Sequence, residues 1–259
     1  MDKILKLKRE LIISTLSLVL VLLFSSTLQA QKLRFSYEAS QVKMDSTWDK
    51  NNDMVIQGII DFYKPELDRV MNEVIAVSEV EMRSGRPESL LSNFAVDLLY
   101  EYSKEASGGR VDFALTNFGG LRAALPKGDV RRYDIFSIFP FENYVVIIDI
   151  WGKDLIDLFN SMAGRSVEAL SYNVLVEISN GKLKDVLLEG EQIDITRKYR
   201  VATIDFLLGG GDSLSALTRA TEVENTGVLL RDAIIKMIEE RSALGHKLTS
   251  SITNRVRYE

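Results

Sequence analysis

Apolar residues recur along the chain with two different periods, which together predict a mixture of helices and strands. Spacings of three and four positions are typical of helices, and they predict helices over residues 54–71, 90–102, 153–162 and 228–238. Short runs rich in apolar and β-branched residues are typical of strands. We place these at residues 74–80, 111–115, 144–151, 172–178, 183–188 and 199–205. The pattern therefore predicts a domain of mixed helices and strands.

Two further features bear on the sheet. The dipeptide Asn180-Gly181 separates two strand candidates, and such a dipeptide is typical of a two-residue hairpin turn. The tail, residues 255–259, is a candidate edge strand. Residues 32–52 are mostly polar with scattered aromatic side chains, so we expect an extended arm or a single strand there.

The first thirty residues have the pattern of a secretory signal peptide. Four basic residues precede an apolar stretch from Leu11 to Phe24, and Ala30 is a small residue suited to cleavage, so the mature chain would begin at Gln31. The alternative is a retained membrane anchor, but the apolar stretch is shorter than the ~20 residues that span a bilayer. We therefore predict a periplasmic or secreted protein without a stable membrane span after cleavage.

This interpretation gives three parts: a signal peptide at 1–30, an N-terminal arm and linking helix at 31–73, and one domain at 74–259. The chain has 32 basic and 37 acidic residues; the signal segment contains four and two of these, which leaves 28 and 35 and a net charge of −7. No basic block interleaves with aromatic residues, so we do not expect nucleic-acid binding. The absence of cysteine excludes disulfides, thiol nucleophiles and zinc–thiolate sites.

The sequence contains a single histidine, His246, in a polar segment where we expect it to be exposed. Hydrolytic zinc sites and two-metal sites normally use several histidine and carboxylate ligands. A Ser-His-Asp triad would also need a buried histidine beside its nucleophile. We therefore expect no catalytic residue, no metal site and no cofactor in this chain.

Two strand candidates end in glycine-containing loops that carry polar and aromatic residues. Glycine lets backbone N–H groups approach a ligand closely, and arginine presents a fork of donors to an anion. Each loop alone is equally consistent with an ordinary turn or connector. The first loop supplies Asn117, Gly119, Gly120, Arg122, Phe141 and Asn143, and the second supplies Phe206, Gly210, Gly211 and Asp212.

Together the two loops contain the side chains that a nucleotide or nucleoside pocket needs. Phe141 and Phe206 could sandwich a flat ring, since stacking on a base is worth about 1–3 kcal/mol in nucleic-acid sites. Asp212 could accept hydrogen bonds from sugar hydroxyls, and Arg122 could bind a phosphate or carboxylate. This prediction requires the loops to lie together in the fold.

The order and spacing of these motifs resemble the 5′-nucleotidase C-terminal domain family, over roughly Asp45 to Arg257. Ser92 stands where that family usually has glycine. The matching segments are Asn117–Arg122 for N-x-G-G-[IL]-R, Gly128–Val130 for G-[DE]-[IV], Pro140–Asn143 for PF-x-N, Trp151–Leu155 for [TW]-G-x-x-L, Phe206–Asp212 for F-x-x-x-G-G-D, Arg86–Ser89 for R-x-E-[SC], and Ser92–Asp97 for G-N-[LF]-x-x-D.

The resemblance implies an α+β fold with mixed sheets packed between helices in an α/β/β/α arrangement, and a nucleotide-binding role. Phe141 and Phe206 would stack on the base, and Asp212 would hold the ribose hydroxyls. Asn143 would orient the base or the loop. The other implied contacts, on the phosphate or ribose side, are Arg122, Asn117 and Arg86, with the loop glycines Gly119, Gly120, Gly210 and Gly211.

Besides Ser92, the sequence departs from the family in a larger respect. Full-length members carry an N-terminal metallophosphatase domain with a dinuclear metal site, whose Asp-x-His and Gly-Asn-His signatures are absent here. We therefore expect the nucleotide-binding half of a split, secreted 5′-nucleotidase-type hydrolase of nucleotide catabolism. It would be inactive without a separate metallophosphatase chain that holds divalent metals. The alternatives are a stand-alone periplasmic nucleotide- or nucleoside-binding protein without catalysis, and a structural remnant with an unused pocket.

Overall fold

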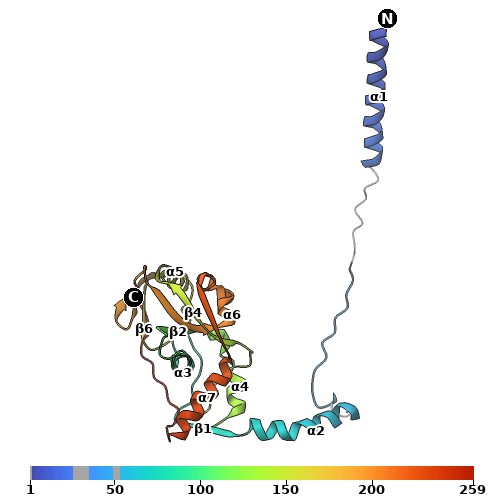
Figure 1. Cartoon of the computed structure of the whole chain (residues 1–259). Coiled ribbons are helices and arrows are strands. Elements are labelled where there is room, and N and C mark those ends of the chain that lie inside the picture. Colours follow the sequence, from blue (N-terminus) through green and yellow to red (C-terminus); the bar gives the residue numbers. More distant parts are fainter. Residues whose placement is uncertain (1, 26–34, 49–52) are drawn as a thin grey trace. The chain divides into compact units, whose positions relative to one another are not determined.

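The computed structural model describes residues 2–25, 35–48 and 53–259, drawn as ribbons in Figure 1. The chain divides into two units, Met1–Met54 and Val55–Glu259. The first unit contains α1 (Asp2–Ser25), and residues 35–44 have neither helix nor strand. The cleavage position predicted after Ala30 lies outside the described residues. Within the described ranges, no helix combines the length and apolar character that a bilayer crossing requires.

The second unit is built on a five-stranded mixed sheet with strand order β10-β4-β9-β2-β5. β4 runs antiparallel to both of its neighbours, whereas β2 and β9 run parallel to each other. The centre of β4 is apolar on both faces and buried, as expected for a strand covered on both sides. The strands are β2 (Phe113–Thr116), β4 (Tyr144–Trp151), β5 (Ala169–Leu170), β9 (Lys198–Ile204) and β10 (Glu222–Leu229).

Two smaller sheets complete the unit. Asn180 and Gly181 both have positive φ and join β6 to β7, which confirms the predicted hairpin. The tail forms β11 at an edge, parallel to β6, as predicted. The four-stranded sheet has the order β11 (Val256–Tyr258), β6 (Val174–Ser179), β7 (Lys182–Leu188) and β8 (Glu191–Gln192), and the two-stranded sheet pairs β1 (Val74–Ser78) with β3 (Gly128–Arg131).

Helices cover these sheets and confirm the predicted α+β class. α3 and α7 pack against each other and against strands of the five-stranded sheet, and α5 packs against both β4 and β7. In Figure 1, α4 and α7 lie side by side close to β1. The helices are α2 (Met54–Met71), α3 (Leu90–Ala106), α4 (Arg132–Ile138), α5 (Gly152–Ala163), α6 (Asp205–Leu208) and α7 (Leu230–Ala243), with 3-10 turns at Phe118–Gly120, Gly211–Ser213 and Ser215–Arg219.

α2 differs from the other long helices of its unit because none of its residues is buried. It continues through Pro65 as one helix. The polar side carries two ion pairs within the helix, Lys64–Asp68 and Arg69–Glu66. A stripe of apolar side chains at spacings of three and four, Ile60, Tyr63 and Leu67, is exposed.

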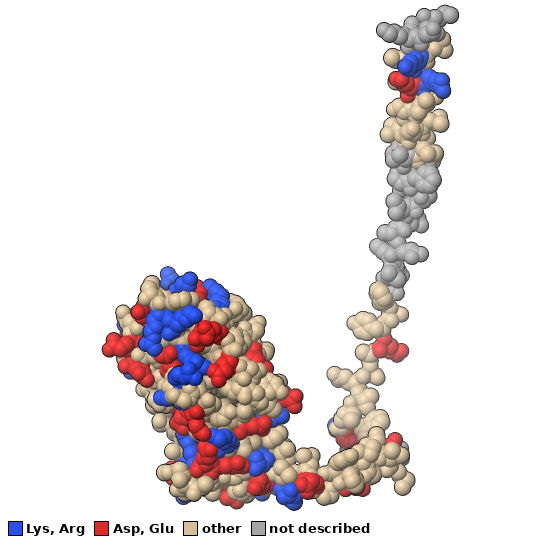
Figure 2. Space-filling model, in the orientation of Figure 1, with Lys and Arg blue, Asp and Glu red and all other residues tan. Residues whose placement is uncertain are grey.

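Two elements of the second unit do not follow from the hydrophobic pattern. β10 is an edge strand whose first half, Glu222–Asn225, is mostly polar and exposed, so it lacks the alternation of a half-buried strand. α4 is only seven residues long, and its Tyr and Phe residues favour strands. On the face of the domain shown in Figure 2, basic and acidic side chains are intermingled.

Candidate functional site

The two glycine loops meet because the strands that precede them are parallel neighbours. In the ladder, Phe113 of β2 pairs with Val201 of β9, so both strands end at the same edge of the sheet. The first loop begins at Asn117 and the second begins at Asp205, directly after these ends. β4 runs antiparallel beside β9, so Asn143 enters the sheet at the same edge. Carboxyl ends of parallel strands are a common place for ligand binding.

A cavity of about 390 Å³ opens between these loops. Its size falls within the range of small-molecule sites. Phe141 and Phe206 line it while 48% and 47% exposed, respectively, which is unusual for phenylalanine and leaves ring surface available for contact. The cavity is lined by Asn117, Gly119, Gly120, Arg122, Phe141, Asn143, Phe206 and Asp212, all of which belong to the predicted site.

A hydrogen bond joins the two loops across the cavity. The Asn117 side-chain amide donates to the Asp212 carboxylate with an Nδ2–Oδ2 distance of 2.6 Å. This bond fixes the orientation of the amide, because the reverse orientation would place two oxygens together. Asn117 is only 5% exposed, and its Oδ1 has no hydrogen-bond partner among the residues that the structure describes. A buried acceptor without a partner costs free energy, so Oδ1 offers a position for a donor from a ligand or a water.

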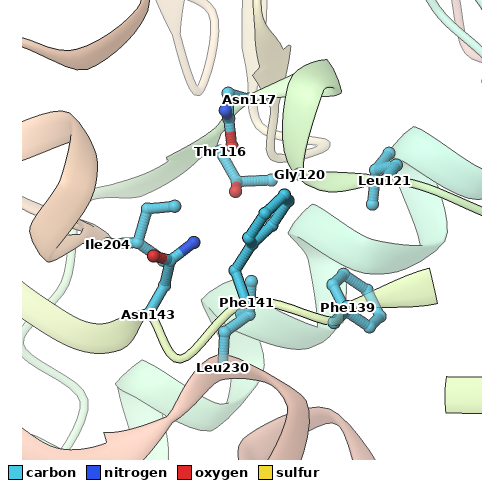
Figure 3. Close-up of a pocket in the computed structure, with 9 residues that line it drawn as sticks. All are labelled: Thr116, Asn117, Gly120, Leu121, Phe139, Phe141, Asn143, Ile204 and Leu230. Carbon is cyan, nitrogen blue, oxygen red and sulfur yellow. The ribbon is translucent and has the colours of Figure 1, made fainter. Parts of the chain in front are cut away.

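A smaller recess of about 10 Å³ adjoins the cavity and shares Asn117, Gly120, Phe141 and Asn143 with it. Figure 3 shows the Phe141 ring and the Asn143 amide extending toward Thr116 and Gly120. The backbone carbonyl of Asn143 accepts a hydrogen bond from the Leu230 N–H at the start of α7. This bond anchors the segment that carries Phe141 to the start of α7.

Arg122 is the cationic group of the cavity. Its backbone N–H donates to the Ile138 carbonyl, which holds the loop, while its side chain is exposed. Within the described part of the chain, the guanidinium has no hydrogen-bond or ion-pair partner. All of its donors are available to an anion.

The loop glycines make room for side chains of the protein itself. A Cβ on Gly120 would lie 2.9 Å from Asn117 Oδ1, and one on Gly211 would lie 2.5 Å from the Phe206 ring. Gly210 has a φ of +85°, which favours glycine. Gly119 and Gly120 line the cavity, whereas Gly210 and Gly211 do not and act by shaping the second loop. The Gly120 N–H is already used by the Asn117 carbonyl.

Arg86 lies beside this cavity. It lines a second one, of about 370 Å³, which shares Gly119 and Asp212 with the first. Its guanidinium donates to Glu168 Oε1 at 2.7 Å and lies over the Phe118 ring, 4.5 Å from the centroid. Arg83, the nearby arginine, instead pairs with exposed Glu81.

Sequence reasoning missed the residues that hold Arg86 and the second loop. Glu168 is buried, and besides Arg86 it accepts a hydrogen bond from the Phe118 N–H, which fixes the first loop. Arg165 also lines the second cavity and donates to carbonyls of the second loop. Both come from the segment between α5 and β5, where no glycine or aromatic motif marks them. The feature that identifies Glu168 is its buried carboxylate beside Arg86, and this contact can be recognised only once the fold is known.

The polar residues of the segment 88–97 form a separate cluster. Asn93 and Asp97, which lie one turn apart on α3, are tied into the core. Asn93 is buried and donates to Glu88, and Asp97 accepts two hydrogen bonds from Arg255. Ser92 accepts the Ser89 N–H, and Ser89 accepts the Ser92 N–H, in a reciprocal cap at the start of α3. The serine at the family's glycine position therefore stabilises the helix end.

Comparison with known proteins identifies the family and the extent of the match. Residues 74–219 match the family described as 5′-nucleotidase, C-terminal domain. The trifunctional nucleotide phosphoesterase YfkN of Bacillus subtilis is 29% identical over 76% of this chain and 15% of that protein. Protein UshA of Escherichia coli is 32% identical over 51% of this chain and 25% of UshA. The crystal structure of a 5′-nucleotidase precursor from Thermus thermophilus superposes with a TM-score of 0.66 at 22% identity, covering 78% of this chain and 42% of that one.

The match therefore covers a minor part of each relative's length. In residues 2–25, 35–48 and 53–259, no group of three or more histidine or acidic side chains is placed to hold a metal ion. His246 is exposed, as predicted.

Proposed function

The chain belongs to the 5′-nucleotidase C-terminal domain family, the substrate-binding part of 5′-nucleotidases, and from that premise we propose that it binds a nucleotide and presents it to a separate metallophosphatase chain. The reaction is release of phosphate from a nucleotide in nucleotide catabolism. We propose that this occurs outside the cytoplasm, after cleavage at Ala30. Mass spectrometry of the protein from its native host tests the cleavage, because a chain that retains residues 1–30 contradicts it.

The observation that carries the proposal is the pair of half-exposed phenylalanines on a cavity that also contains a carboxylate and an arginine, Arg122, with no partner in the described part of the chain. Phe141 and Phe206 provide apolar faces for a base. Asp212 has carboxylate capacity left for ribose hydroxyls beyond its bond from Asn117. Arg122 is available for the phosphate, since arginine binds phosphate through two parallel hydrogen bonds.

A second chain enters the proposal because of the metal chemistry. A dinuclear site generally draws on several histidine and carboxylate ligands, and these 259 residues contain one exposed histidine. Metals held by a partner would supply the activated water and polarise the phosphate. This chain's own residues would bind the base, hold the ribose and, through Arg122, keep the phosphate positioned as its charge develops.

α2 supplies a surface for that partner. The helix buries none of its own residues, yet it presents Ile60, Tyr63 and Leu67 on one stripe. Isolated helices of this length are marginally stable in water, and exposed apolar patches mark interaction sites. The stripe lies on the polypeptide just before β1 and the nucleotide-binding domain, in the part of the chain predicted from sequence as a linking helix.

Calorimetry with adenosine tests the pocket. Phe141→Ala and Phe206→Ala should each weaken binding by about 1–3 kcal/mol, the value of one base stack, with little change in the free energy of unfolding because both rings are half-exposed. Tyr133→Ala, which removes an exposed ring on α4, is the control. Unchanged affinity in both phenylalanine variants would support the remnant with an unused pocket.

A second assay tests whether hydrolysis requires both chains. It measures phosphate release from AMP in the presence of Mn²⁺ or Zn²⁺, with and without a metallophosphatase encoded beside this gene. We expect no release by this chain alone and release by the pair. The double variant Ile60→Asp, Leu67→Asp should lose release by the pair while its affinity for adenosine is unchanged. Activity of this chain alone would contradict the proposal, and adenosine binding without release by any pair would favour the stand-alone binding protein.

A further inference from the structure

The second glycine loop has an unusual backbone at the residue that faces the cavity. Asp212 and Ser213 have φ values of +50° and +60°, so two consecutive residues other than glycine adopt the left-handed conformation. Such residues are uncommon, and they persist where the surrounding structure holds them in place. The conformation directs the Asp212 carboxylate toward Asn117 of the first loop.

One side chain holds both of these residues. The Arg165 guanidinium donates to the carbonyl of Asp212 at 3.4 Å and to that of Ser213 at 3.1 Å. The same group is anchored to the end of α5, where it donates to the backbone carbonyl and the hydroxyl of Ser161. Arg165 therefore connects the carboxyl end of a helix to the strained turn of the second loop.

Arg165 has no carboxylate partner among the residues that the structure describes, so no ion pair explains its position. Its hydrogen-bond partners are neutral carbonyl and hydroxyl groups of Ser161, Asp212 and Ser213. Arg86, which lines the same cavity, is by contrast compensated by Glu168. A guanidinium fork that spans two successive carbonyls fixes the direction of the peptide between them.

We propose that Arg165 is a positioning residue that sets the Asp212 carboxylate for the ribose hydroxyls of the bound nucleotide. The inference rests on the proposed function, because it takes Asp212 as the ribose-binding group. Without Arg165 the turn is free to leave its left-handed conformation, and the carboxylate loses its fixed direction. Stacking of the base on Phe141 and Phe206 does not depend on the direction of the Asp212 carboxylate, so this part of the binding should be unchanged.

The test compares adenosine with 2′,3′-dideoxyadenosine, which has the same base and lacks both hydroxyls. Calorimetry on the wild-type chain should show weaker binding of the dideoxy compound by about 10–150-fold, the worth of hydrogen bonds to a charged acceptor. In Arg165→Ala, the adenosine affinity should fall toward that of the dideoxy compound. The dideoxyadenosine affinity itself should change less than about twofold, since its contacts do not involve Asp212.

Three further variants separate positioning from other roles. Arg165→Lys keeps one donor group and should show an intermediate ratio between the two ligands. Asp212→Asn should lose the ratio as Arg165→Ala does, and the double variant should lose no more than either alone, because the two residues act as one unit. Arg83→Ala, which removes an exposed arginine paired with Glu81, is the control and should leave the ratio unchanged.

The outcomes are distinguishable from failure of the proposed function. If the wild-type chain does not bind adenosine, or binds both ligands equally, the proposed function or its ribose contact is wrong. If the wild-type chain discriminates and Arg165→Ala still does so, the inference about Arg165 is wrong. Equal weakening of both ligands, or additive loss in the double variant, also overturns it. Selective loss of AMP affinity with an unchanged adenosine ratio would instead assign Arg165 to the phosphate.

Discussion

Two clusters of polar side chains in this domain resemble each other in composition and differ in how their hydrogen-bonding groups are used. In the buried cluster of Glu88, Asn93, Asp97 and Arg255, each side chain bonds to another part of the protein. Glu88 accepts from Asn93 and from the backbone N–H groups of Thr253 and Arg255. Arg255 is 5% exposed, and its guanidinium bonds to Asp97 and the Leu170 carbonyl. The cluster ties α3 to the C-terminal tail.

In the loop cluster of Asn117, Arg122 and Asp212, by contrast, some hydrogen-bonding groups have no partner within the described residues. Asn117 Oδ1 has no partner, and the Arg122 guanidinium has none within the described residues. Asp212 accepts one side-chain hydrogen bond through Oδ2. Since buried polar groups are normally satisfied within the protein, the difference separates residues that stabilise the fold from residues that are available to a ligand. Both clusters include residues of the motifs that resemble the family, so the motifs alone do not make this distinction.

The two carboxylates of the buried cluster have pKa values that are shifted in opposite directions. Burial is the largest influence on Asp97 and raises its pKa against the opposing effect of Arg255. For Glu88, burial again acts to raise the pKa, but hydrogen bonds from Asn93, Thr253 and Arg255, with the charge of Arg255, together lower it. The same arginine therefore lies between one carboxylate held charged and one that burial disfavours as an anion.

The largest effect should come from removing the cation of the buried cluster. Arg255→Ala leaves two carboxylates without their partner, and loss of one member of a buried ion pair costs about 3–5 kcal/mol. Urea unfolding measures this change. Arg257→Ala is the matched control, because Arg257 is exposed and its pair with Glu177 should contribute about 0–1 kcal/mol. A loss in Arg255→Ala as small as in the control would contradict the comparison.

The next effect should appear in binding and leave stability intact. Arg122→Ala removes the unpaired cation of the loop cluster, so AMP should bind more weakly by about 1.5–3 kcal/mol, the worth of hydrogen bonds to a charged group. Adenosine affinity, which involves no phosphate, should be unchanged. The free energy of unfolding should stay within about 0.5 kcal/mol of wild type. A destabilised variant with unchanged AMP affinity would show that Arg122 belongs with the fold-stabilising residues.

The smallest effect is a pH dependence of the buried cluster. The pKa of Glu88 lies below its ordinary value of 4.5 in the folded state, so its contribution to stability is present above that pH and is lost as the pH falls through the folded pKa. Glu88→Gln does not titrate at this position. The free energy of unfolding of this variant should be lower than that of wild type by about 1–3 kcal/mol at neutral pH. This difference should shrink in urea titrations below pH 4.5.

Asp97 does not disturb this measurement, although its raised pKa has the opposite sign. Its contribution is present below its ordinary value of 3.8 and is lost as the pH rises through the folded pKa. Asp97 is present in both wild type and Glu88→Gln, so its contribution largely cancels in the difference between their free energies of unfolding. A deficit that is constant from pH 7 to pH 3.5 would contradict the assignment of the lowered pKa to Glu88.

The sequence predicted those features that depend on local pattern. Asn180-Gly181 identified its hairpin, the run from Tyr144 to Trp151 identified the central strand β4, and the glycine loops identified where polar side chains follow buried strands. These signals are local because turn geometry and strand burial constrain neighbouring residues. The positions of Phe141, Phe206 and Asp212 around one cavity depended on the parallel pairing of β2 with β9, which no local pattern specifies.

Residues that act over long distances in the sequence could not be predicted. Glu168 and Arg165 reach the loops from the segment after α5, across about 50 residues to each loop. The role of Asn93 in the core could not be predicted because one of its partners, the Ser251 carbonyl, lies 158 positions away. The edge strand β10 is polar because one side of its ladder is free, and α4 is too short to establish a helical period.

Because of the parallel pairing of β2 with β9, the cavity forms only when the whole domain has folded. Phe113 and Val201 are adjacent in the sheet but widely separated in sequence, so the cavity cannot assemble in a partly folded intermediate that lacks either strand. A ligand that binds only the folded domain would stabilise it by about 2.7 kcal/mol at a concentration of 100 times its Kd. The thermal midpoint of the domain in the presence of adenosine therefore reports folding and recognition in one measurement.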